Sequence, residues 1–219
     1  VPAGPVMLTC GVDVQRDRLV YEVVGWSPDK ESWSIDASEF YGNTSLEATE
    51  PDSPWAALDV LLAHSFPGDG GIDHLIAMMA VDSGDQAQVV YNWCRRHPMT
   101  RVIACKGSRL ASMLVGAPSP VDVTARGRKM QRGYRVWSTG VSIAKAELYG
   151  WLRLPRGDGD PPPGYCHFPE YGESFFEQLT AEHLVTVVNR KTRRTRMEWH
   201  VLPTRETHWL AARILARVA

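Results

Sequence analysis

Two apolar runs in this chain each end in a carboxylate. Residues 6–12 lead into Asp13, and residues 75–81 lead into Asp82. Such runs are typical of strands that are buried on both faces of a sheet. An ionised Asp in that setting costs free energy unless a cation or a metal ion pairs with it. The pattern therefore predicts that two strands bring two carboxylates together at one edge of a sheet, and Asp13 and Asp82 become the candidate active centre.

Hydrophobic periodicity predicts the elements around these two runs. Strands are expected over residues 19–26, 32–36, 101–106 and 134–138, a hairpin over 184–188 and 197–201, and helices over 54–65, 85–96, 142–154, 175–179 and 204–218. Residues 107–132 are expected to form a basic loop. A strand–helix–strand succession pairs its strands in parallel by a right-handed crossover. We therefore expect an α/β fold, with a mixed β-sheet flanked by helices and with the hairpin and a C-terminal helix appended, in a single domain over residues 1–219.

Composition excludes several other classes of protein. The 219 residues are 44% hydrophobic and 22% charged, which is ordinary for a globular domain with a full core. No apolar stretch reaches the roughly 18 residues that a membrane helix needs. Four scattered cysteines without C-x-x-C spacing argue against a zinc site or a disulfide framework and favour an intracellular protein: Cys10, Cys94, Cys105 and Cys166.

The formal net charge of −1 hides two basic blocks. One comprises Arg126, Arg128, Lys129 and Arg132, and the other comprises Arg190, Lys191, Arg193, Arg194 and Arg196. Two interpretations are open at this point. Either both blocks are solvated loops, or they face a polyanion while acidic surface elsewhere balances the charge.

Two carboxylates with no His or Cys nearby in the sequence suit a hard divalent cation such as Mg²⁺ or Mn²⁺. Two such ions about 4 Å apart can support phosphodiester cleavage. Asp82 also ends a strand just before a helix, where open α/β sheets bind their ligands. Simpler explanations exist for each residue alone, because Asp13 could begin a hairpin turn and Asp82 could cap the helix that follows.

The chain resembles the nuclease domain of the lambda-like phage terminase large subunits. The matching motifs follow the order of that family over essentially the whole chain: residues 11–15, 81–84, 106–107, 144–145, 167–169 and 178–180. The resemblance implies a ribonuclease H-like endonuclease that cuts concatemeric double-stranded viral DNA in the host cell cytoplasm. It also implies an N-terminal packaging ATPase joined through residues 1–5, and the terminase small subunit and the portal as partners, with no membrane. The chain itself has no Walker-type phosphate loop and is not expected to hydrolyse ATP.

The resemblance further implies that Asp13 and Asp82 bind metal and that a third acid lies on the last helix. Ala211 stands where that third Asp is expected. Three interpretations compete: an engineered substitution that disables the nuclease, a natural residue in a domain that only binds DNA, or a shifted register in which Glu206 serves instead. We favour the first and expect little or no cleavage from the chain as it stands.

The same resemblance suggests that Lys106 contacts the scissile phosphate or orients a water molecule, and that Lys145 has a weaker claim to such a role. The two basic blocks then become clamps on the DNA backbone, with contacts that are independent of sequence and sensitive to salt. Two alternative functions remain: a non-catalytic DNA-binding or assembly module, and an actin-like or Rossmann-like nucleotide binder.

Overall fold

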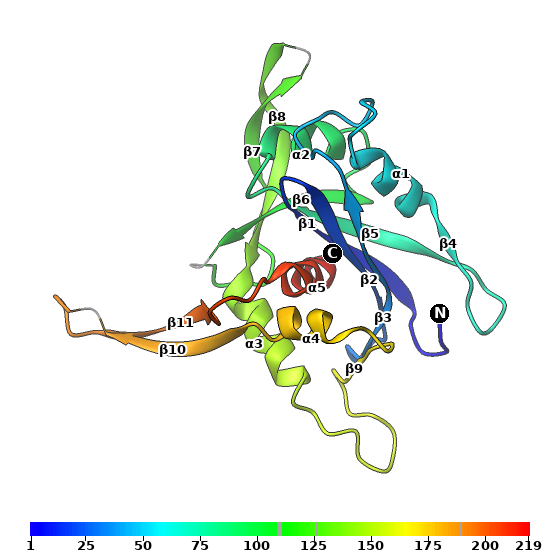
Figure 1. The fold of residues 1–219 in the computed structure, drawn as a ribbon, viewed down its shortest axis with the longest axis vertical. Coiled ribbons are helices and arrows are strands. Elements are labelled where there is room, and N and C mark those ends of the chain that lie inside the picture. Colours follow the sequence, from blue (N-terminus) through cyan, green and yellow to red (C-terminus); the bar gives the residue numbers. More distant parts are fainter. Residues whose placement is uncertain (109–110, 126, 189) are drawn as a thin grey trace.

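The computed structural model describes residues 1–108, 111–125, 127–188 and 190–219. Within these ranges a mixed sheet runs in the order β7-β8-β6-β5-β1-β2-β3-β9, with β4 beside β5 (Figure 1). Its strands are β1 (Met7–Val14), β2 (Arg18–Trp26), β3 (Ser32–Tyr41), β4 (Ser65–Phe66), β5 (His74–Asp82), β6 (Val102–Ser108), β7 (Ser119–Ala125), β8 (Arg128–Gly140) and β9 (Cys166–His167). β1, β2 and β3 pair antiparallel, whereas β1, β5, β6 and β8 pair in parallel. The expected mixed α/β architecture is confirmed.

Helices cover both faces of this sheet. α1 (Trp55–Ala63) and α2 (Ala87–Cys94) pack on one face, and α3 (Val141–Trp151), α4 (Glu173–Leu179) and α5 (His208–Val218) lie on the other. Side chains alternate along β1, so Leu8, Cys10 and Val12 enter the core under α1 and α2. The intervening positions, which end in Asp13, therefore face α5.

α5 lies directly on β1 because Gly11 has no side chain. A Cβ atom on Gly11 would be 1.9 Å from the backbone oxygen of Ala212, so the helix could not approach this closely over any other residue. One turn further along the helix, the Thr9 hydroxyl donates a hydrogen bond to the backbone oxygen of Ala216 at 2.6 Å. The approach at Gly11 fixes which residues of α5 lie beside the end of β1.

A buried ion pair also holds α5 to the sheet. The Arg213 guanidinium donates to Glu22 Oε1 on β2 at 2.8 Å and to the Ser32 hydroxyl on β3 at 2.7 Å. Both charged side chains are almost completely shielded from solvent, at 1% and 0% exposure. Removing one partner of such a pair leaves the other charged and uncompensated, so a change of either residue alone would destabilise the packing of α5 on the sheet.

Two hairpins extend from the body of the protein (Figure 1). β10 (Glu182–Val188) and β11 (Thr195–Val201) form a separate two-stranded sheet, as expected for the appended hairpin. β7 and β8 form the other, and here the expected basic loop over residues 107–132 is wrong. The loop prediction failed because contacts with a distant helix stabilise these strands: Val123 is fully buried, and the backbone N–H of Thr124 donates to Gln88 Oε1 of α2 at 2.8 Å.

The last helix also begins later than its periodicity suggested. It starts at His208 instead of residue 204, because Thr204 has a positive φ of 67° and breaks the helical backbone before it. In the described part of the chain, no helix is both long and apolar enough to cross a membrane.

Candidate active site

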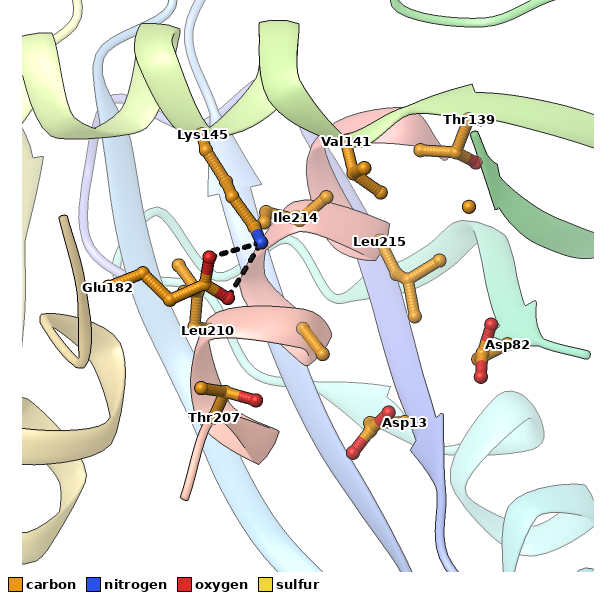
Figure 2. Close-up of a pocket in the computed structure, with 12 residues that line it drawn as sticks. Asp13, Asp82, Thr139, Val141, Lys145, Glu182, Thr207, Leu210, Ile214 and Leu215 are labelled. Atoms are coloured by element: carbon orange, nitrogen blue, oxygen red, sulfur yellow. Dashed lines mark hydrogen bonds and ion pairs between the residues drawn. The ribbon is translucent and has the colours of Figure 1, made fainter. Parts of the chain in front are cut away.

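Asp13 and Asp82 line one pocket of about 190 Å³ at the ends of β1 and β5 (Figure 2). Val12 and Val81 are register partners in the parallel pairing of these strands, so the residue that follows each of them lies at the same edge of the sheet. The sequence-based prediction that two strand ends bring these carboxylates together agrees with this placement. Helix α5 and the start of α3 form the opposite wall of the pocket.

The two carboxylates differ in their surroundings. Burial and the nearby charge of Asp13 raise the pKa of Asp82 to about 6, although the backbone N–H groups of Gly84 and Ser83 oppose the shift. Burial disfavours the charged form of a carboxyl group, and a neighbouring carboxylate disfavours it further. Asp82 is therefore ionised at neutral pH at a cost in free energy, in a position that would gain from a cation.

Asp13 is held by two side-chain donors. Gln15 Nε2 donates to Asp13 Oδ2 at 2.7 Å, and His208 Nδ1 lies 2.9 Å from the same oxygen. The hydrogen bond to Asp13 raises the pKa of His208, with partial burial opposing the shift. His208 was not among the residues predicted for the site. No local signal could have revealed the contact, which depends on the packing of α5 against β1.

Position 211 lies at the pocket as well. Ala211 is one of the lining residues, so an acidic side chain at this position would share the pocket with Asp13 and Asp82. Glu206 is not among the lining residues: its side chain is 57% exposed, and its carboxylate lies 3.5 Å from Arg18 Nη2. Over the described ranges, no group of three or more His, Cys, Asp or Glu residues is arranged to hold a metal ion. The strand ends thus offer the pocket two carboxylates, Asp13 and Asp82, with a methyl group at position 211.

Two lysines were considered for the site, and only Lys145 is among its lining residues. Lys106 is exposed on β6, and its neighbour Gly107 lines the pocket instead. Because side chains alternate along a strand, Lys106 points to the opposite face of the sheet. Lys145 reaches the pocket from α3, and its ammonium lies 2.6 Å from both carboxylate oxygens of Glu182. Glu182 was not among the residues predicted for the site.

Comparison with known proteins identifies the family of the chain. The family described as terminase large subunit gpA, endonuclease domain, matches residues 1–219. The chain belongs to this family. It is 31% identical over 191 residues to the terminase large subunit of Escherichia phage lambda and 29% identical over 191 residues to that of Enterobacteria phage P21. Each comparison covers 84% of the chain, which spans only 28% of the length of these curated relatives. No solved structure matches the chain.

The two basic blocks of this endonuclease domain lie on its two hairpins, and none of their described residues lines the pocket. Arg128, Lys129 and Arg132 are exposed on β8, where Lys129 Nζ pairs with Asp122 Oδ2 at 3.0 Å. Arg126 lies outside the described residues. The remaining predicted contacts occupy the turn between β10 and β11 and are exposed: Arg190, Lys191, Arg193 and Arg194. The two blocks are therefore on separate projections of the molecule (Figure 1).

Proposed function

We propose that this domain hydrolyses phosphodiester bonds of double-stranded phage DNA during packaging, as the metal-dependent endonuclease part of a terminase large subunit. The observation that carries the proposal is the shared pocket of Asp13, Asp82 and position 211 at the ends of two parallel strands. The family of the chain supports the same reaction.

The proposed fold relationship is to ribonuclease H-like nucleases. Its support is the sheet order β3-β2-β1-β5-β6, with β1 antiparallel to β2 and parallel to β5. This arrangement places one acid near the end of the first strand and a second at the end of β5, as the resemblance implies. A helix at the end of the chain carries position 211 to the same edge.

The pocket fits a hard divalent cation, Mg²⁺ or Mn²⁺. Its candidate ligands Asp13 and Asp82 are carboxylates, and Mg²⁺ is commonly bound through one or two carboxylates with water completing the shell. Burial and the negative charge of Asp13 raise the pKa of Asp82, and positive charge beside Asp82 would oppose that rise. A divalent cation would supply that charge and would stabilise the negative charge that develops during phosphodiester hydrolysis.

The protein's own residues orient the carboxylates. His208 and Gln15 fix the Asp13 carboxylate through the two contacts to its Oδ2 atom. At Asp82, the backbone N–H groups of Gly84 and Ser83 favour the charged carboxylate and oppose the rise of its pKa. Groups that orient metal ligands in this way commonly strengthen metal binding ten- to hundredfold, roughly. The Asp13 carboxylate is thus held in place before a cation binds.

Ala211 limits this reaction. A third carboxylate at position 211 would compensate the charge of a second cation, and a methyl group cannot. We infer that Ala211 replaces the third acid and that the chain as it stands cleaves DNA slowly or not at all. The alternative that Ala211 leaves open is a domain that binds and positions DNA without cutting it.

The partners we propose follow from the family and from the two hairpins. Exposed arginines and lysines on both hairpins are suited to the phosphates of duplex DNA, through contacts that depend on salt and not on base sequence. In the whole protein we expect a packaging ATPase N-terminal to this domain, and the small subunit and the portal as further partners, in the cytoplasm of the infected cell.

Nicking of supercoiled plasmid tests the proposal. The substitution Ala211→Asp should produce Mn²⁺-dependent nicking that EDTA abolishes, whereas Ala211→Asn, which has nearly the same volume and no charge, should not. Adding Asp82→Asn to the Ala211→Asp variant should abolish the activity. If Ala211→Asp remains inert while it still binds duplex DNA, the non-catalytic alternative is correct and the nuclease proposal is wrong.

A further inference from the structure

The pocket contains a charged pair that the proposed reaction has not used. Figure 2 shows Lys145 and Glu182 pointing toward one another at one side, with Asp13 and Asp82 at the other side and residues of α5 between them. We propose that Lys145 contacts a backbone phosphate of the DNA strand that enters this pocket, and that Glu182 positions the Lys145 ammonium for that contact. This inference rests on the proposed function of the same pocket.

The pair is held from several directions. Lys145 Nζ lies 2.6 Å from both oxygens of Glu182, and the two side chains are only 16% and 8% exposed. The backbone N–H of Glu182 donates to the Tyr149 hydroxyl at 3.0 Å, one helical turn beyond Lys145 on α3. Tyr149 in turn stacks on Trp199 of β11 at 5.1 Å between ring centroids. These contacts fix Glu182 at the base of the hairpin and leave the ammonium little freedom to move.

A purely structural role is a weak explanation for this pair. Burying two charges has a desolvation penalty that often equals or exceeds their attraction, so apolar residues of similar size would hold α3 to β10 about as well. Apolar residues already form much of the surrounding wall, including Val141, Leu210 and Ile214. An ion pair in such a wall is better explained by a requirement for charge or for N–H donors.

Lys145 supplies what the rest of the pocket lacks. Of the described residues that line it, Lys145 is the one with a cationic side chain, whereas Asp13, Asp82 and Glu182 are acidic. An ammonium has three N–H donors, and bonds to the two oxygens of Glu182 leave at least one donor for another acceptor. Phosphate oxygens are suitable acceptors, and lysine binds them as a compact point charge. In this arrangement a phosphodiester of the DNA lies in the pocket. The carboxylates of Asp13 and Asp82 and their cation are on one side of it, and the Lys145 ammonium is on the other.

The test measures binding of a fluorescent DNA duplex by anisotropy as a function of salt, in Ca²⁺, which is chosen to fill the carboxylate site during binding. The double variant Lys145→Met with Glu182→Met removes both charges together and avoids leaving either one buried alone. We expect duplex affinity to fall roughly three- to tenfold, and the slope of log affinity against log salt to become shallower by about 0.9, the contribution of one phosphate contact. Lys145→Arg keeps the cation and should retain most of the salt slope.

Lys30→Met is the matched control for loss of a positive charge. Lys30 also pairs with a glutamate of α3, Glu147, at 3.5 Å, but its side chain is 58% exposed and it does not line the pocket. This variant should leave affinity and salt slope unchanged. In the Ala211→Asp background, the double variant should also lower the rate of nicking at saturating Mn²⁺ without changing the Mn²⁺ midpoint.

Two results would overturn the inference. One is an unchanged affinity and salt slope in a double variant that melts at the parent's temperature. The other is a Lys145→Arg variant whose salt slope becomes shallower by as much as that of the double variant. The Ala211→Asp protein could fail to nick DNA while its salt slope still depends on Lys145. In that case the nuclease proposal would be wrong and the phosphate contact would stand. If the parent binds no duplex at all, both proposals are wrong.

Discussion

Asp82→Asn should stabilise the metal-free domain at neutral pH. Burial and the charge of Asp13 raise the pKa of Asp82 from 3.8 to about 6, so the folded state prefers the uncharged carboxyl group. Asn is an uncharged side chain of nearly the same shape. Each pKa unit corresponds to about 1.4 kcal/mol, so a shift of roughly two units gives at most about 3 kcal/mol. We expect a gain of about 1–3 kcal/mol in the free energy of unfolding, because relaxation and water reduce such penalties.

The sign of the pH dependence follows from linkage. Below pH 3.8 Asp82 is protonated in both the folded and the unfolded state, and the preference of the fold for the neutral form has its full effect. That contribution is lost as the pH rises through the folded-state pKa of about 6. The difference between Asp82→Asn and the parent should therefore be near zero at low pH, grow through this window and level off above it.

Urea unfolding followed by circular dichroism, in EDTA and at a series of pH values, measures this difference. Asp122→Asn is a control of opposite sign, because the backbone N–H of Arg132 and the side chain of Lys129 lower the pKa of Asp122. Adding Mn²⁺ should stabilise the parent and not Asp82→Asn, since only a ligand that binds the folded state raises its stability. Equal unfolding free energies of parent and Asp82→Asn throughout this pH range in EDTA would refute the reasoning.

Three further predictions concern the packing and orientation of the site. Gly11→Ala should destabilise the fold by about 3 kcal/mol or more in thermal melts, because its Cβ would meet the α5 backbone at 1.9 Å. Gly150→Ala is the control: its Cβ would have nothing within 4 Å, so this change should be neutral or slightly stabilising. Arg213→Met should lower the free energy of unfolding by about 3–5 kcal/mol, because it leaves Glu22 buried and unpaired. Adding Glu22→Met should recover most of that stability. A double variant no more stable than Arg213→Met alone would contradict this prediction. His208→Ala should weaken Mn²⁺ binding roughly ten- to hundredfold in a calorimetric titration, and an unchanged affinity would remove its role in orienting Asp13.

The sequence predicted the centre of the fold better than its periphery. β1 and β5 were identifiable because a buried parallel strand must be apolar along its length, which makes a terminal Asp conspicuous. The strand–helix–strand order predicted the parallel pairing of β5 with β6, and the Asp at the end of each run suggested that β1 and β5 meet at one edge. The hairpin of β7 and β8 was missed because its strands are mostly exposed and depend on α2, which lies far away in the sequence.

The parts of the site contributed by helices were less predictable. Periodicity showed that the last helix has an apolar face, but the side of that helix that meets β1 is set by the close approach at Gly11. That rotation brings His208 to Asp13 and Ala211 to the pocket. The Lys145–Glu182 pair joins positions 37 residues apart on a helix and a hairpin, and no local pattern connects them.

Anomalous diffraction from Mn²⁺-soaked crystals of the Ala211→Asp variant would show whether the three carboxylates bind metal. We expect Mn²⁺ density in contact with the carboxylates of Asp13 and Asp82 and with the new carboxylate at position 211. Asp13→Asn in the same background should lose or weaken that density. Mn²⁺ bound elsewhere on the domain, with none at these carboxylates under conditions that support nicking, would contradict the account.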